Sequence, residues 1–113
     1  MRVRNATRGV PLGDRIDVAD TSAKRRTGLL KHTGLAEGEG LWIAPCEAVH
    51  TFGMKFPIDV VFVSRKRRVL KVRKEMDRRG IALCLWAQSV LELPPGTVDR
   101  TGTQKGDQLE FER

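Results

Sequence analysis

Short runs of apolar residues, separated by turn residues, dominate the pattern along the chain. Residues 14–19 alternate polar side chains with Ile16 and Val18, which predicts a half-buried strand because neighbouring strand residues point to opposite faces. Residues 58–63 are apolar and mostly β-branched apart from Asp59, and they predict a strand that is buried on both faces. Further strands are predicted over residues 41–43, 49–52, 68–73, 81–86, 90–93 and 108–111.

One short helix is predicted near the N-terminus, over residues 22–31. Thr21 and Ser22 offer side-chain oxygens suited to an N-cap, and a glycine follows the expected end. The helix would direct Leu29 and Leu30 toward the core. Because short strands and turns dominate, the pattern predicts a mainly β (α+β) fold. The expected form is a small antiparallel β-barrel or sandwich of about seven short strands with one short N-terminal helix.

Length and composition favour one domain over residues 1–113. A chain of this size with 40% hydrophobic residues can bury a core without disulfides or a structural metal. The first residues are charged, and no apolar run approaches the length of a membrane span, about 18 residues, so neither a secretion signal nor a membrane anchor is predicted. The two cysteines, Cys46 and Cys84, are therefore expected to be reduced thiols of a cytoplasmic protein.

Basic residues are concentrated in one segment, residues 65–79. It holds nine of the 21 lysines and arginines and two of the 14 acidic residues, so the rest of the chain is formally neutral. A hairpin is expected here, with its turn at residues 65–67. Such a run is often a solvated face, but it offers an alternative function, weak nucleic-acid binding, although the segment holds no aromatic residue on which a base could stack. The cations predicted to carry this alternative are Arg65, Lys66, Arg67, Arg68, Lys71 and Arg73.

Residues 45–59 combine side chains that often carry chemistry. Cys46, His50 and Met54 recur every four residues and offer a thiolate, an imidazole and a thioether, a ligand set suited to copper(I). Prolines and β-branched residues indicate strand and loop here, and an extended chain would hold Cys46 and His50 about 13 Å apart. Alternatively, His50 could activate Cys46 as a nucleophile while Asp59 orients the imidazole. No CxxC, HxxxH or known cysteine-hydrolase motif reinforces a metal site or a Cys46/His50 enzyme, so both are alternatives.

Two carboxylates interrupt strongly apolar runs. Asp59 lies within residues 58–63, and Glu92 lies within residues 90–93. Burying an unpartnered charge is costly, so each carboxylate is expected to meet hydrogen-bond donors. Either each one ties down a neighbouring loop, or both line one polar pocket in an apolar wall. The candidate donors for Asp59 are His50, Thr51, Lys55 and backbone N–H groups.

Five stretches carry a recognisable family pattern: Thr27-Gly28-Leu29-Leu30, Glu39-Gly40-Leu41-Trp42, Val49-His50-Thr51-Phe52-Gly53-Met54-Lys55, Ile58-Asp59-Val60-Val61-Phe62 and Val90-Leu91-Glu92-Leu93-Pro94-Pro95-Gly96. Between Val18 and Asp107 the chain thus resembles domain-of-unknown-function family 192, a widespread bacterial and archaeal group. The resemblance implies a small β-barrel-like domain of a prokaryote, with a short helix and no established activity. Residues 51–54 depart from the commoner aromatic-Trp-Met form, and the basic turn at 65–67 replaces the usual Asp and Gly. The positions that match recurrent family residues are Met54, Asp59, Glu92 and Gly96.

These observations favour a binding domain over an enzyme. No phosphate-binding loop, glycine-rich dinucleotide motif or HExxH sequence occurs, so no metal or cofactor is predicted. We expect a pocket for a small polar or cationic molecule, and no membrane partner. The residues predicted to form this pocket are His50, Thr51, Met54, Asp59 and Glu92.

Overall fold

The structure, a computed structural model, describes residues 1–77 and 79–113. Five strands form a central sheet in the order β3 (Arg15–Ala19), β4 (Glu39–Ile43), β9 (Ser89–Leu93), β6 (Ile58–Val63) and β7 (Val69–Met76). A second sheet has the order β10 (Leu109–Glu112), β1 (Arg2–Asn5) and β2 (Val10–Gly13). A third sheet pairs β5 (Ala48–His50) with β8 (Ile81–Leu83), and the helices are α1 (Ser22–Thr27) and α2 (Thr97–Thr101).

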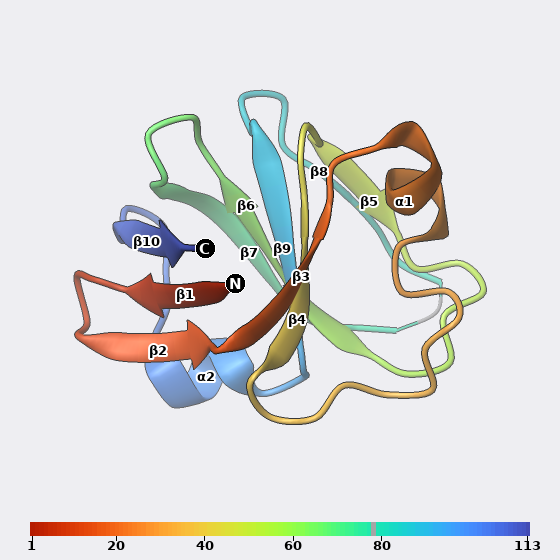
Figure 1. Ribbon diagram of the computed structural model, residues 1–113, viewed down its shortest axis with the longest axis horizontal. Coiled ribbons are helices and arrows are strands. Elements are labelled where there is room, and N and C mark those ends of the chain that lie inside the picture. Colours follow the sequence, from red (N-terminus) through yellow and green to blue (C-terminus); the bar gives the residue numbers. More distant parts are fainter. Residues whose placement is uncertain (78) are drawn as a thin grey trace.

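The central sheet separates two hydrophobic cores. Val3 of β1 and Leu91 of β9 belong to the core beside the three-stranded sheet and α2. Val49 of β5, Ala82 of β8 and Phe62 of β6 belong to the other core. Figure 1 shows the two smaller sheets on opposite sides of the central strands. The mainly β fold is therefore confirmed in its sandwich-like form, because the sheets of the described chain do not close into a barrel.

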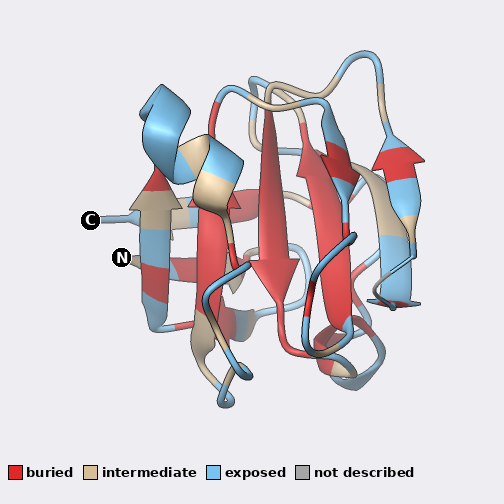
Figure 2. Cartoon of the chain, turned by 90° about the vertical axis from the view of Figure 1, so that its right-hand side faces the viewer, coloured by how far each residue is buried: buried red, intermediate tan, exposed pale blue. Residues whose placement is uncertain are grey.

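Strand β6 is buried on both faces, as its apolar run predicts. Val61 and Val63 lie in the core beside the three-stranded sheet, whereas Val60 and Phe62 lie in the core beside β5 and β8. Strand β9 is also buried along its whole length, and Figure 2 shows both strands at the centre of the molecule. Because successive residues point to opposite faces, each position on these strands faces one core or the other.

Strands β3 and β4 run parallel, which departs from the expected antiparallel arrangement. Their register pairs Ile16 with Gly40 and Val18 with Trp42. The connection between them contains α1 and a long loop, and a crossover of this length can return the chain to the start of a parallel neighbour. The other strand pairs of the central sheet are antiparallel.

Helix α1 is shorter than predicted. The side chain of Thr21 caps it by accepting a hydrogen bond from the Lys24 N–H at 3.2 Å. The helix ends at Thr27 because Gly28 takes a φ of 49° and leaves the helical conformation. Leu29 is buried as expected, whereas the expectation for Leu30 is wrong, since the chain turns and leaves this side chain exposed. Neither helix of the described chain has the length and apolar character needed to cross a membrane.

Three elements are absent from the sequence prediction: β1, β2 and α2. Strand β1 buries Asn5 and β2 contains Pro11, so neither shows the apolar alternation that predicts a strand. The described chain therefore has ten strands instead of about seven. Strand β8 is also shorter than the predicted range 81–86, because the residues after Leu83 turn toward β9.

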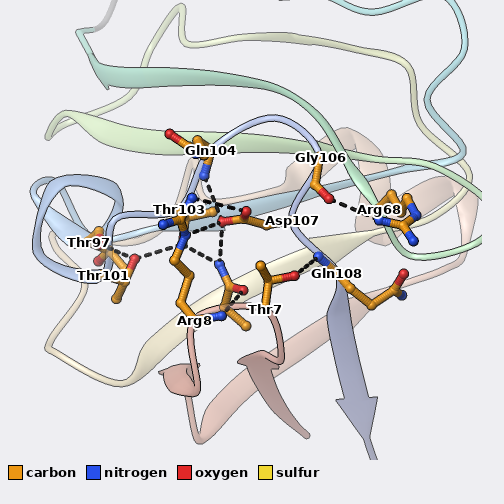
Figure 3. A network of polar contacts seen from close by, with 11 residues as sticks. Thr7, Arg8, Arg68, Thr97, Thr101, Thr103, Gln104, Gly106, Asp107 and Gln108 are labelled. Atoms are coloured by element: carbon orange, nitrogen blue, oxygen red, sulfur yellow. Dashed lines mark hydrogen bonds and ion pairs between the residues drawn. The ribbon is translucent and has the colours of Figure 1, made fainter.

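A buried polar network joins the start of the chain to its end. Asp107 accepts hydrogen bonds from the side chains of Asn5 and Arg8, at 2.9 and 3.0 Å, and from the Gln104 N–H at 3.1 Å. Asn5 also donates to Thr103 Oγ1 at 3.1 Å. Figure 3 shows these contacts around Asp107. Burial opposes ionisation of Asp107, but the bonds from Arg8, Asn5 and Gln104 outweigh it and lower the pKa of this carboxyl.

Candidate functional site

A pocket of ≈ 510 Å³ opens between α1 and the turn after it on one side and β4, β5 and β9 on the other. Its size lies within the range of natural small-molecule sites, about 300–1,000 Å³. Leu29, Ile43 and Val49 give it apolar walls. The polar and sulfur-containing side chains that line it include Arg25, Arg26, Cys46, His50, Met54 and Glu92.

Glu92 lines this pocket from within the apolar sheet. It lies on β9 opposite Leu41 of β4 and Val60 of β6, and both of these residues belong to the core beside β5 and β8. Its residue surface is 5% exposed. Burial raises the pKa of Glu92 from 4.5 to about 7. None of the described residues donates a hydrogen bond to its carboxyl group, and its oxygens are not among the fully enclosed polar atoms that lack a partner. The carboxyl group therefore faces the open pocket.

Two arginines of α1 bring positive charge to the same pocket. The Arg25 guanidinium donates to the carbonyl oxygens of Asp20 and Ala44, at 3.1 and 3.5 Å, which holds it against the pocket mouth. Arg26 is exposed. In the described part of the chain, neither guanidinium forms an ion pair with a carboxylate. Their charge is therefore available to an anionic group that enters the pocket.

Cys46 lies in the pocket as a protonated thiol. Its sulfur donates to the Ala48 carbonyl oxygen at 3.1 Å. Burial raises the pKa of Cys46, which opposes the thiolate that a nucleophile or a metal ligand requires. Among the described residues, no group of three or more His, Cys, Asp or Glu side chains is placed to hold a metal ion. Cys46, His50 and Met54 all line this pocket, so the Cys46/His50 enzyme and the metal site both remain predictions.

His50 and Met54 lie in the pocket, whereas Thr51 between them does not line it. His50 is exposed at the end of β5, with its ring centroid 5.4 Å from that of Phe52. Met54 is buried in the pocket wall. The Thr51 hydroxyl instead contacts the Asp77 carbonyl oxygen and accepts a hydrogen bond from the Gly80 N–H at 2.8 Å. Thr51 thus fastens its loop to the residues before β8.

Asp59 lies outside the pocket, on the opposite face of the central sheet. In the register of β6 and β9, Glu92 stands opposite Val60, so Asp59 and Glu92 point to different cores. Asp59 is fully buried and accepts hydrogen bonds from the Glu75 N–H at 2.9 Å and the Val98 N–H at 2.8 Å. The structure thus brings Glu92, but not Asp59, to the pocket, and it gives Asp59 the loop-fastening role.

The cations of the predicted basic hairpin have different surroundings. Arg67 lies 4.9 Å from the ring centroids of both Trp42 and Phe111, so it packs on aromatic rings. Lys71 and Arg73 extend from β7 to carbonyl oxygens of β8, at 3.0 and 3.4 Å. The residues exposed at the hairpin turn are Arg65, Lys66 and Arg68. Arg78, which the basic segment also includes, lies outside the described residues.

The fold and this pocket define a small, mainly β domain with a cavity between a central sheet and an N-terminal helix. The chain belongs to domain-of-unknown-function family 192 (DUF192, described as Uncharacterized ACR), whose family model matches residues 3–111. This match confirms the family resemblance and covers more of the chain than the five stretches that indicated it.

Similar proteins come from archaea and bacteria. A UPF0127 protein of Thermococcus sibiricus is 29% identical over 113 residues, which cover 96% of this chain and 73% of the relative. The crystal structure of a protein of unknown function from Novosphingobium aromaticivorans matches with a TM-score of 0.83 at 25% identity, covering 97% of this chain and 82% of that one. A candidate transcription regulator from Sinorhizobium meliloti matches with a TM-score of 0.82 at 24% identity, covering 96% and 89%. The solved structures support the fold.

Sequence reasoning missed Arg25 and Arg26. Both lie in the predicted helix, but they are more than 60 residues from Glu92 in the chain. The available signal was the run Lys24-Arg25-Arg26, because three cations on a six-residue helix need water or an anionic neighbour. Their meeting with Glu92 depends on how α1 packs over the sheet.

Proposed function

We propose that the protein is a small-molecule-binding domain and that its ligand occupies the pocket beside α1. The observation that carries this proposal is Glu92, a buried acid without a hydrogen-bond partner in the described chain, in the wall of a pocket of ≈ 510 Å³. The sheet withdraws most of this residue from water and offers its carboxyl group no donor, so a ligand that supplies one gains affinity from it. Asp59 and Thr51 do not line this pocket and are not among the proposed contacts.

The lining favours a ligand with two polar ends. A cationic or hydrogen-bond-donating group would meet Glu92, and an anionic group would meet the guanidinium groups of Arg25 and Arg26. The apolar walls between them suit a short hydrocarbon portion. Small zwitterions such as amino acids combine these features. The sequence predicts a small polar or cationic ligand, and the lining of the pocket narrows this class to molecules that carry both a donor group and an anionic group.

Thermal denaturation with a panel of amino acids, primary amines and short carboxylic acids tests this proposal. A ligand at 100 times its Kd should stabilise the protein by about 2.7 kcal/mol and raise its Tm accordingly. In Glu92→Gln, the same compound should give little or no shift. In the control Glu112→Gln, which removes an exposed carboxylate, the shift should be retained.

Two results would contradict the proposal. One is that no compound of the panel stabilises the wild-type protein. The other is that a stabilising compound raises the Tm of Glu92→Gln as much as that of the wild type, because its binding would then not involve the pocket acid.

A further inference from the structure

The β6–β7 turn and the loop between β8 and β9 lie together at one edge of the molecule. The Gln88 N–H donates to the Val63 carbonyl oxygen at 2.9 Å. The Arg67 guanidinium donates to the Gln88 side chain at 3.2 Å. Figure 1 shows both loops at the upper edge. Two segments that are separated in the chain therefore form one continuous surface.

An exposed tryptophan lies on this surface. Trp86 is 86% exposed. This exposure is unusual, because tryptophan has the largest side chain and is highly buried on average. Together with Arg65 it lines a hollow of ≈ 410 Å³ that also includes Glu47 and Gln88. The basic hairpin has no aromatic residue in its own sequence, but the fold places one beside it.

The cations at the turn have no acidic partner within the described chain. Arg65, Lys66 and Arg68 are exposed there, and none of them forms an ion pair with a described carboxylate. By contrast, Lys74 farther along β7 pairs with Asp99 at 2.6 Å. The positive charge of the turn is therefore available to an anionic partner.

We infer that this edge binds single-stranded nucleic acid, with a base stacked on Trp86 and the adjoining phosphates at Arg65, Lys66 and Arg68. Unpaired bases stack on exposed aromatic rings, and phosphates bind unneutralised cations, so both halves of this ligand match the surface. Paired bases in a duplex are already stacked and offer no free face to one protruding indole. The site is separate from the pocket beside α1 and does not depend on the function proposed for it.

An anionic membrane surface is the competing partner, because Leu85 and Leu83 are also exposed near Trp86. The hollow beside the indole, however, is also lined by two polar residues, Glu47 and Gln88. Hydrogen-bonding groups of this kind suit the edges of a base, whereas insertion into lipid would strip them of water. The observations therefore favour nucleic acid, and the membrane becomes an outcome of the test.

Fluorescence anisotropy with a labelled 15-nucleotide oligo-dT or oligo-U, measured between 50 and 200 mM salt, tests the charge. The wild type should bind, and its affinity should fall as salt rises. The triple variant Arg65→Ser/Lys66→Ser/Arg68→Ser should bind at least about tenfold more weakly at 50 mM salt, and its log–log salt slope should be shallower by about 2. The matched control Lys24→Ser/Lys31→Ser/Lys55→Ser removes three other exposed cations and should keep most of the affinity.

A second measurement tests the stacking. Trp86→Ala should weaken binding by about five- to a hundredfold without changing the salt slope, because stacking involves no counterion release. Oligonucleotide binding should also quench the tryptophan emission of the wild type but not that of Trp86→Phe, since the other tryptophan, Trp42, is buried. Trp86 is too exposed for either substitution to unfold the domain.

The inference is overturned if the wild type fails to bind either oligonucleotide at 50 mM salt, or if the two triple variants lose affinity equally. It is also overturned if the wild type binds vesicles of phosphatidylcholine and phosphatidylserine through Trp86 but neither oligonucleotide. Glu92→Gln should bind the oligonucleotides like the wild type, which separates this site from the pocket. A failure of pocket binding would therefore leave this result unaffected.

Discussion

Glu92 and Asp59 are both acids in apolar strands, but their carboxyl groups have different partners. Asp59 accepts two backbone N–H groups, one from Glu75 and one from Val98. The carboxyl of Glu92 has no such donor in the described chain, and burial raises its pKa to about 7. A supported carboxylate stabilises the fold, whereas an unsupported one is held at a cost and is free to interact with a ligand.

The raised pKa of Glu92 predicts a pH-dependent stability. Because the folded pKa is about 7 and the ordinary value is 4.5, the folded state binds the proton more tightly, so stability falls as pH rises between these values. Glu92→Gln removes this dependence. The difference in free energy of unfolding between Glu92→Gln and the wild type should therefore move in favour of the variant by about 3 kcal/mol from pH 4.5 to pH 8.

Urea unfolding of both proteins at several pH values measures this difference. The exposed control Glu112→Gln should follow the wild type throughout. A constant difference between Glu92→Gln and the wild type across this range would show that the pKa of Glu92 is ordinary in the folded protein.

Substitution of Asp59 should lower the stability of the protein without abolishing ligand binding in the pocket. Asp59→Ala leaves the Glu75 and Val98 N–H groups without their acceptor, and the variant should be about 3 kcal/mol less stable. Asp59→Asn keeps one acceptor oxygen and should lose less. Urea unfolding measures both variants, and any ligand that stabilises the wild type should still raise the Tm of Asp59→Asn. An unchanged stability of Asp59→Ala would contradict the fastening role.

Among the elements, β1 and the loop before β10 are held by side-chain contacts at Asp107. Arg8, Asn5 and Gln104 hydrogen bond to this carboxylate and lower its pKa. Since the folded pKa is lowered, this contribution is present above the ordinary pKa and is lost as pH falls through the folded value. The network therefore ties the two ends of the chain together at neutral pH.

Asp107→Asn should destabilise the protein at pH 7 by about 2 kcal/mol, because charge-assisted bonds become ordinary ones and one acceptor oxygen is lost. The difference from the wild type should shrink as the pH falls below the ordinary pKa of the carboxyl group, because the unfolded state then takes up a proton before the folded state does. Thermal unfolding at pH 7 and pH 3 measures both values. A difference that stays constant with pH would mean that the charge of Asp107 does not contribute.

At the scale of the whole molecule, the central sheet contributes to both cores. Val60 and Val61 are neighbours on β6, but they belong to different cores. A disturbance of either core therefore reaches the same strand, and the two cores should unfold together. This coupling follows from a sheet that is buried on both faces.

Val60→Ala and Val61→Ala should each reduce the free energy of unfolding by about 2 kcal/mol and leave a single transition. In a Trp86→Phe background, the emission of Trp42 reports one core while circular dichroism reports the whole chain. The two signals should change at the same urea concentration in both variants. Separate midpoints would show that the cores unfold independently.

Local pattern was sufficient for much of the fold. The β-branched run of β6, the alternation of β3, the cap at Thr21 and the turn at Arg65 act between close neighbours, so they are readable from the chain. Strand β1 was not predicted, because its buried Asn5 finds its hydrogen-bond partner in Asp107, more than 100 residues away in the chain. The parallel pairing of β3 with β4 was not predicted either, because strand pairing depends on contacts between distant segments.

The sequence by itself determined that Asp59 and Glu92 lie in apolar strands and that a basic turn follows β6, because burial and turns follow from short-range pattern. The tertiary structure alone decided that the two acids face opposite cores, that Arg25 shares a pocket with Glu92, and that Trp86 lies beside Arg65. The physical reason is register and packing. A shift of one residue in strand pairing reverses the face of every side chain, and only contacts between distant segments set that shift.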